Sequence, residues 1–464
     1  MRFKRFESRA LVLVFLAIVW VGITSTITIG APQQAASASS AAPTFSADVA
    51  PIFYAKCVAC HRPGEVAPMS LITFKDVRPW ASSIRDRVTT RVMPPWHADR
   101  QYGSFRNEQS LTQGEIDTIV KWVNANAPEG DPSRMPALPQ FPEGWQIGTP
   151  DAVFAMPTTY AIPATGEIEY QYFEVPTNFT EDRWMQAGEV RAGDRAHVHH
   201  IIVYVKAPNP TPSSSVMVNR PITSAAPATA VAVTPPAPRP VAPRPAAPRA
   251  QAGASPVART GDQMLVNWAV GEDAPVFLPG MAKRIPKGSS LVFQVHYTTN
   301  GTPSSDQSRI GLIFAKEPPK HEVRTGMILN PLLAIPPGAA NHEIAAEATF
   351  TEDIHVWSMH PHMHLRGKDM TYTATYPDGR SEIVLRVPKF DFGWQTDYWL
   401  AKPLVLPKGS KLHVSAHYDN STANRHNPDP NATVRWGDQT WEEMMIGFFT
   451  YTVEGRPATS SASR

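Results

Sequence analysis

The chain has 464 residues, of which 42% are hydrophobic, and a formal net charge of +2 from 43 basic and 41 acidic side chains. This length exceeds what one hydrophobic core usually holds, so we expect two to four domains. Because the charges nearly balance, no extended basic surface is expected, which argues against nucleic acid as a partner.

The first 31 residues have the pattern of an export signal. A basic region through Arg9 precedes an apolar run over residues 10–22, and small residues that suit cleavage follow. Apolar and hydroxyl residues continue to Ile29, nearly enough to span a bilayer. We expect residues 1–31 to be a signal peptide or a membrane anchor, and the protein to be periplasmic or secreted, or anchored to the membrane through this segment.

Both cysteines of the chain stand in one Cys-x-x-Cys-His motif, Cys57 to His61. Two thiols three positions apart on a helix can form thioethers to a haem, and the next histidine can ligate the iron. No further cysteine pair completes a zinc site, and the flanks lack the βαβ pattern of thioredoxin-like proteins. The motif, with Cys57, Cys60 and His61, therefore predicts one covalently attached haem c.

Helical patterns lie on both sides of this motif. Apolar residues recur at helical spacing before it, and a second helix is predicted over residues 111–126, where Thr112 and Glu115 can form a capping box. Residues 45–135 resemble class I cytochromes c, which implies a small all-α domain.

The second axial ligand in that family is usually a methionine on a loop after the motif. The sequence Arg91-Val-Met93-Pro-Pro-Trp96 supplies one that two prolines stiffen, so Met93 is our assignment. Met69 is the competitor, but it lies only eight residues after His61, a short path to the opposite haem face.

From about Pro150 onward the sequence alternates between apolar and polar residues, with turns such as Pro286-Lys-Gly288, which predicts all-β sandwiches or jelly rolls. One stretch, residues 207–258, lacks this alternating pattern. It is rich in Pro and Ala and contains no acidic side chain, so we expect a disordered insertion in the first β domain.

Histidines and methionines gather in four places of the β region. These are His197-Val-His199-His200, Gln294-Val-His296-Tyr297, Met359-His-Pro-His-Met-His-Leu-Arg-Gly-Lys368 and Glu442-Glu-Met444-Met445. Neutral imidazoles suit copper or zinc, and a thioether adds a preference for Cu(I). A redox metal is therefore expected.

In their order these clusters resemble the type II copper, ascorbate-dependent monooxygenases, the family of dopamine β-hydroxylase and peptidylglycine α-hydroxylating monooxygenase. The resemblance covers roughly residues 148–454. It implies two consecutive jelly-roll domains, here residues 145–315 and 316–456, each holding one copper, which face each other across a solvent-filled cleft.

The resemblance also implies the ligands of both coppers. The electron-storing copper would be held by His199, His200 and His296, and the oxygen-activating copper by His362, His364 and Met444. His360 shares a strand face with His362 and could replace His364, although the Leu-x-Gly-Lys that follows His364 favours the later pair.

Some positions depart from the family. Met445 stands where the animal enzymes often carry Cys, while His360 and Phe448 replace the arginine and tyrosine that hold a peptide carboxylate. A buried carboxylate needs such partners, so peptide amidation is disfavoured.

These observations predict an exported copper monooxygenase that inserts one oxygen atom from O₂ into a substrate C–H bond. The expected partners are a small-molecule substrate, O₂ and a single-electron donor, either an ascorbate-like reductant or a redox protein, with the haem supplying or relaying electrons. Two alternatives are an electron-transfer or copper-binding haem protein without oxygenase activity, and a binding module with the haem as sensor.

Overall fold

The computed structural model describes residues 42–63, 65, 67–141, 144–208, 217–222, 263–269, 274–456 and 458. The predicted signal or anchor, residues 1–31, lies outside these ranges, as does most of the predicted insertion. The described residues from Pro43 onward belong to one compact unit. None of the helices in the described ranges is long and apolar enough to cross a membrane.

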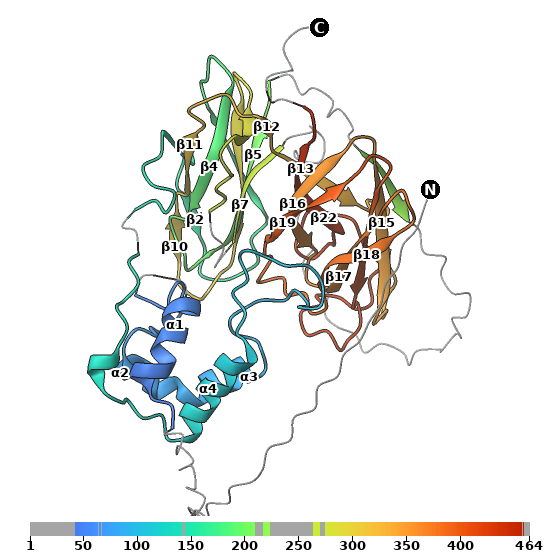
Figure 1. Ribbon diagram of the computed structural model, residues 1–464. Coiled ribbons are helices and arrows are strands. Elements are labelled where there is room, and N and C mark those ends of the chain that lie inside the picture. The colour runs from blue at the N-terminus through green and yellow to red at the C-terminus, as the bar shows by residue number, and fades with distance from the viewer. Residues whose placement is uncertain are drawn as a thin grey trace, which may run out of the picture. The chain divides into compact units, whose positions relative to one another are not determined.

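Four short α-helices and three other helical turns lie between Phe45 and Arg134 (Figure 1). The predicted capping box is confirmed: the Thr112 hydroxyl accepts from the Glu115 backbone N–H, and the Glu115 carboxylate accepts from the Thr112 backbone N–H. Trp122 is fully buried in the core of these helices. In chain order the elements are η1 (Phe45–Val49), α1 (Ala50–Lys56), α2 (Phe74–Val77), η2 (Arg78–Trp80), α3 (Ala81–Thr89), α4 (Gln113–Asn124) and η3 (Pro132–Arg134).

Two sheets share the first β core, in which Ile201, Phe293 and Leu312 are fully buried. The five-stranded sheet has the order β1 (Ala152–Ala155), β11 (Arg309–Phe314), β4 (Arg183–Arg191), β8 (Met281–Ile285), β12 (His321–Glu322). The four-stranded sheet has the order β3 (Gln171–Pro176), β9 (Ser290–Tyr297), β5 (Val198–Lys206), β7 (Gln263–Ala269). A two-stranded ribbon joins β10 (Ser304–Asp306) to β2 (Tyr160–Ile162).

Two further sheets share a second core, in which Tyr372 and Phe350 are buried. One has the order β13 (Arg324–Leu329), β22 (Ile446–Val453), β16 (Ile354–His362), β19 (Tyr398–Leu406). The other has the order β18 (Ser381–Val387), β17 (Gly367–Thr375), β20 (Lys411–Tyr418), β15 (His342–Phe350), β6 (Met217–Ile222). A small ribbon pairs β14 (Ala334–Ile335) with β21 (Val434–Arg435).

The predicted fold class, an all-α cytochrome c domain followed by two jelly-roll sandwich domains, is wrong. Of the described residues 39% lie in strands and 12% in helices, and the α-helices are 4 to 12 residues long. The strands form four small sheets of four or five strands in a propeller-like arrangement. Alternating sequence predicts strands, but the choice of partner strands depends on tertiary packing, and the resemblance gave the wrong architecture.

The predicted disordered insertion, residues 207–258, also needs correction. Within it, Met217–Ile222 forms strand β6 and pairs antiparallel with β15, where Pro221 lies opposite Ala346. Because β6 is the last strand of its sheet, proline is tolerated there. Part of the stretch assigned to the first β domain thus completes a sheet of the second core.

Candidate metal centres

A β-bulge brings three histidines together on neighbouring strands β5 and β9. His200 lies opposite His296, and Val198 lies opposite Tyr297, so His199 is an extra residue in β5. Regular alternation would point His199 and His200 to opposite faces, but a bulge re-aims one side chain. We call His199, His200 and His296 the first cluster.

The geometry of the first cluster suits a metal ion. Its ring centroids are 5.0 to 5.2 Å apart, and one ring nitrogen from each residue lies within 4.8 Å of the others. The Nδ1 atoms of His199 and His200 are 2.9 Å apart. Nδ1 of His296 is buried with no hydrogen-bond partner in the described part of the chain. One ring nitrogen from each of the three histidines would hold the ion.

The other nitrogen of His296 has a contact from a distant part of the chain. Its Nε2 lies 3.4 Å from Oγ1 of Thr440. Metal-ligating histidines usually use their second ring nitrogen in such an outer contact, which fixes the ring orientation.

Burial keeps the imidazoles of the first cluster neutral. It lowers the pKa of His199, and burial together with the neighbouring His199 lowers the pKa of His296 to about 3. Burial and the adjacent imidazoles also hold the pKa of His200 well below its ordinary value. Neutral rings keep the lone pairs that a metal requires.

His362 at the end of β16 and His364 just after it form a second pair of rings, with centroids 5.3 Å apart and planes at 89°. Nδ1 of His362 lies 2.6 Å from the side-chain oxygen of Gln395, and Nδ1 of His364 lies 3.2 Å from the carbonyl oxygen of Glu442. These acceptors place the proton on each Nδ1, so both Nε2 atoms are left as donors for a metal.

Burial again disfavours protonation at this pair. It lowers the pKa of His362 to about 4, with a further contribution from His360, and lowers the pKa of His364 well below its usual value. Both rings are therefore neutral at physiological pH.

Glu443 links the backbone of Met444 to that of His364 through hydrogen bonds. The sequence alone had indicated no role for Glu443. Its buried Oε2 accepts from the backbone N–H groups of His364 at 2.9 Å and of Met444 at 3.3 Å, and its Oε1 accepts from the Arg366 N–H at 2.7 Å. The Tyr418 hydroxyl donates to the Met444 carbonyl at 2.8 Å. We call His362, His364 and Met444 the second cluster.

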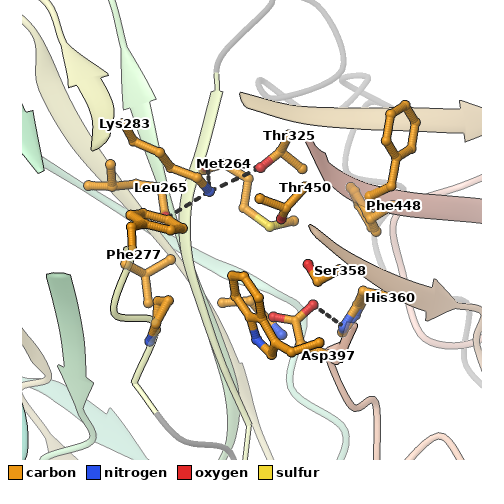
Figure 2. A pocket seen from close by; sticks show the side chains of 15 residues that line it. Met264, Leu265, Phe277, Lys283, Thr325, Ser358, His360, Asp397, Phe448 and Thr450 are labelled. Carbon is orange, nitrogen blue, oxygen red and sulfur yellow. Dashed lines mark hydrogen bonds and ion pairs between the residues drawn. The ribbon is translucent and has the colours of Figure 1, made fainter. Parts of the chain in front are cut away.

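His360, the alternative ligand, has a different partner. Its Nδ1 lies 3.3 Å from the carboxylate of Asp397, beside a small cavity that Lys283 also lines (Figure 2). The ring that lies against His362 is that of His364, so the geometry favours the later histidine pair.

The Cys-x-x-Cys-His motif forms a tight turn after α1. The backbone N–H groups of Cys60 and His61 donate to the Cys57 carbonyl at 3.1 and 2.9 Å, and neither cysteine is part of a disulfide. Nδ1 of His61 lies 3.2 Å from the carbonyl oxygen of Met69, which leaves Nε2 as a donor for iron. The residues fit a haem attached through both thiols.

The two methionines differ in their surroundings. The Met69 carbonyl is engaged with the His61 ring on the Nδ1 side, and Met69 packs partly against the helical core. Met93 is half-buried in the segment that leads from α3 toward His97. Met93 remains the predicted axial ligand.

A cleft of about 1190 Å³ reaches both clusters. Its walls include His199 and His296 of the first cluster and His364 of the second. The helical part of the chain also contributes, through residues 90–92 and His97. Phe392 lies between the clusters: its ring stacks on His199 at 5.3 Å and meets the His364 ring edge-on at 6.0 Å.

No family model and no curated protein sequence matches the chain. A protein from Eubacterium rectale assigned as secreted is similar at a TM-score of 0.17 and 10% identity, over 61% of this chain and 69% of that one. The structure of infectious bursal disease virus, Gx strain, is similar at a TM-score of 0.17 and 12% identity, over 66% and 72% of the two chains. Scores this low support no inference about fold or function.

Proposed function

We propose that the protein is an exported copper monooxygenase, which inserts one oxygen atom from O₂ into a substrate C–H bond, with a covalent haem c that supplies or relays electrons. The main support for this proposal is the hydrogen bonding of the ring nitrogens of His362 and His364. Both Nδ1 atoms face oxygen acceptors, which leaves both Nε2 atoms as donors, and the Glu443 oxygen that accepts from the backbone N–H of His364 also accepts from that of Met444.

Two imidazoles and a thioether suit copper better than zinc, because a thioether prefers the soft Cu(I) ion. Copper bound at the two clusters would supply one-electron redox chemistry with O₂. Three protein donors at the second cluster leave a coordination position for a small molecule. The first cluster, with three imidazoles, suits an ion that stores an electron.

The chain itself positions these donors. Gln395 and the Glu442 carbonyl hold the two rings of the second cluster, and Thr440 lies against His296 of the first. Burial keeps these imidazoles neutral. Little reorganisation is then needed when an ion binds.

The substrate is proposed to be a small molecule that binds in the cleft, and not a glycine-extended peptide. His360, which replaces the expected arginine, is paired with Asp397 and cannot serve as a free cation for a carboxylate. Phe448 has no hydroxyl to replace the missing tyrosine.

The haem is proposed to be the intramolecular electron donor. Arg62, directly after His61, pairs with Glu65, and Glu65 also pairs with Arg195, which lies four residues before His199. The haem motif is thereby connected to the strand of the first cluster. Export is supported by the basic and apolar pattern of residues 1–31.

Oxygen uptake by copper-loaded protein tests the proposal. With a reductant and candidate substrates, the wild type should consume O₂ in step with hydroxylated product, and Met444→Ala should form no product. Met445→Ala, a change at the neighbouring methionine, should retain product formation if it folds, as shown by retained haem and copper. Equal, substrate-independent uptake by wild type and Met444→Ala would instead indicate an electron-transfer protein.

A further inference from the structure

One turn of the chain, residues 391–395 between β18 and β19, contacts both clusters. Phe392 stacks on His199 with ring planes 16° apart, and a Cβ on Gly393 would lie 4.0 Å from Nε2 of the same histidine. Gln395, three residues after Phe392, accepts a hydrogen bond from Nδ1 of His362 through its side-chain oxygen. We call residues 391–395 the bridging turn.

Hydrogen bonds within the bridging turn give it a defined shape. The Trp394 N–H donates to the Asp391 carbonyl at 2.9 Å, and the Gly393 N–H donates to the Asp391 carboxylate at 2.8 Å. The Gln395 side-chain amide donates to the Phe392 carbonyl at 3.2 Å. The Gln395 side chain thus joins the Phe392 backbone to the His362 ring, so the two contacts cannot move independently.

Phe392 provides a direct packed path between the clusters. Its ring centroid is 5.3 Å from that of His199 and 6.0 Å from that of His364. It also lies 5.7 Å from the His296 ring. Two of the three rings in the first cluster and one in the second therefore meet a single phenyl group.

We propose that Phe392 is the positioning residue for electron passage between the two clusters, and that the bridging turn sets their separation. This inference rests on the proposed function. With copper bound at both clusters, one electron would leave the ion held at the first cluster and reduce the ion held at the second, so that one centre is oxidised as the other is reduced and no proton moves. The phenyl ring is not itself oxidised and acts as the packed contact that the electron crosses.

The test uses full-length, copper-loaded protein and two measurements that do not depend on substrate turnover. Pulsed dipolar EPR of the fully oxidised protein gives the separation of the two Cu(II) ions. Rapid partial reduction then gives the rate at which the electron passes between them. Phe392→Leu removes the aromatic ring, Phe392→Tyr retains it, and Trp394→Leu is the matched control in the same turn.

We expect one narrow distance in the wild type, a broader distribution and a several-fold slower electron passage in Phe392→Leu, and near-wild-type values in Phe392→Tyr and Trp394→Leu. If Phe392→Leu holds two coppers but matches the wild type in both measurements, the inference is overturned while the proposed function stands. If the wild type does not hold two coppers, the proposed function fails first and the inference falls with it.

Discussion

The buried carboxylate of Glu443 accepts a hydrogen bond from the backbone N–H of His364 at 2.9 Å. The same oxygen accepts from Met444, so one side chain holds the backbones of two proposed ligands. These ligands are about eighty positions apart in sequence, and this contact brings them to one place.

Glu443→Ala should therefore disrupt the second cluster. It leaves the N–H groups of His364 and Arg366 without their acceptor, which should lower the free energy of unfolding by about 1–3 kcal/mol. Copper at the second cluster should be lost while copper at the first is retained, as measured by metal analysis. The control is Glu442→Ala, because the Glu442 carboxylate accepts from the Gln439 N–H instead. Equal metal loss in both variants would argue against the role of Glu443.

Gln395→Leu should weaken metal binding at the second cluster by about 10–100-fold, as is typical when the outer hydrogen bond of a ligating histidine is removed. Titration calorimetry with copper measures this affinity. Gln395→Glu keeps an oxygen acceptor for Nδ1 of His362 and should recover most of it. If Gln395→Glu does not bind copper more tightly than Gln395→Leu, the oxygen acceptor for His362 does not determine the copper affinity.

His296→Ala should reduce bound copper by one ion per chain, because it removes one of the three converging imidazole donors. His197→Ala is the comparison. Both nitrogens of His197 are already engaged, by Asp194 at 2.7 Å and by the Thr302 carbonyl at 3.1 Å, so its loss should affect stability but not metal content. If copper is lost in His197→Ala but not in His296→Ala, then His197 and not His296 is a ligand of the first cluster.

Met93→Leu should change the absorption spectrum and lower the reduction potential of the haem, because a thioether ligand favours ferrous iron. Met69→Leu should leave both unchanged, since the contact to His61 uses the Met69 backbone carbonyl and not its side chain. Spectroelectrochemistry of the two variants decides between the methionines, and the reverse pattern would make Met69 the ligand.

Lys283 should make stability depend on pH in the alkaline range. Burial lowers the pKa of Lys283 from 10.5 to about 8, against a smaller opposing effect of Asp397. The unfolded chain then binds more protons than the folded protein between about pH 8 and 10.5, so the free energy of unfolding rises with pH there.

Relative to Lys283→Met, the wild type should gain up to about 1.4 kcal/mol per pH unit across this window. Denaturant unfolding at a series of pH values measures the difference, and comparison with the variant removes the effect of all other groups. A difference that stays flat with pH would show that Lys283 titrates normally.

Local features could be predicted from sequence more reliably than architecture. The Thr112 capping box is confirmed because it depends on residues three positions apart. The fold class was wrong because strand pairing depends on contacts distant in sequence, and the pairing of β6 with β15 left no local signal.

The candidate metal centres were predictable in part. The histidines themselves stand out, but the bulge that turns His199 and His200 to one side depends on the register between β5 and β9. Gln395 lies in a turn with no metal-binding motif, so only the folded chain reveals its contact with His362. Glu443 was visible beside Met444, yet its hydrogen bonds run to His364.

Metal analysis combined with a haem spectrum of the purified full-length protein shows whether both copper ions and the haem are bound. We expect two copper ions for each covalently bound haem, one of which is lost in His296→Ala and the other in Glu443→Ala. Protein that carries its haem but takes up no stoichiometric copper would contradict this expectation.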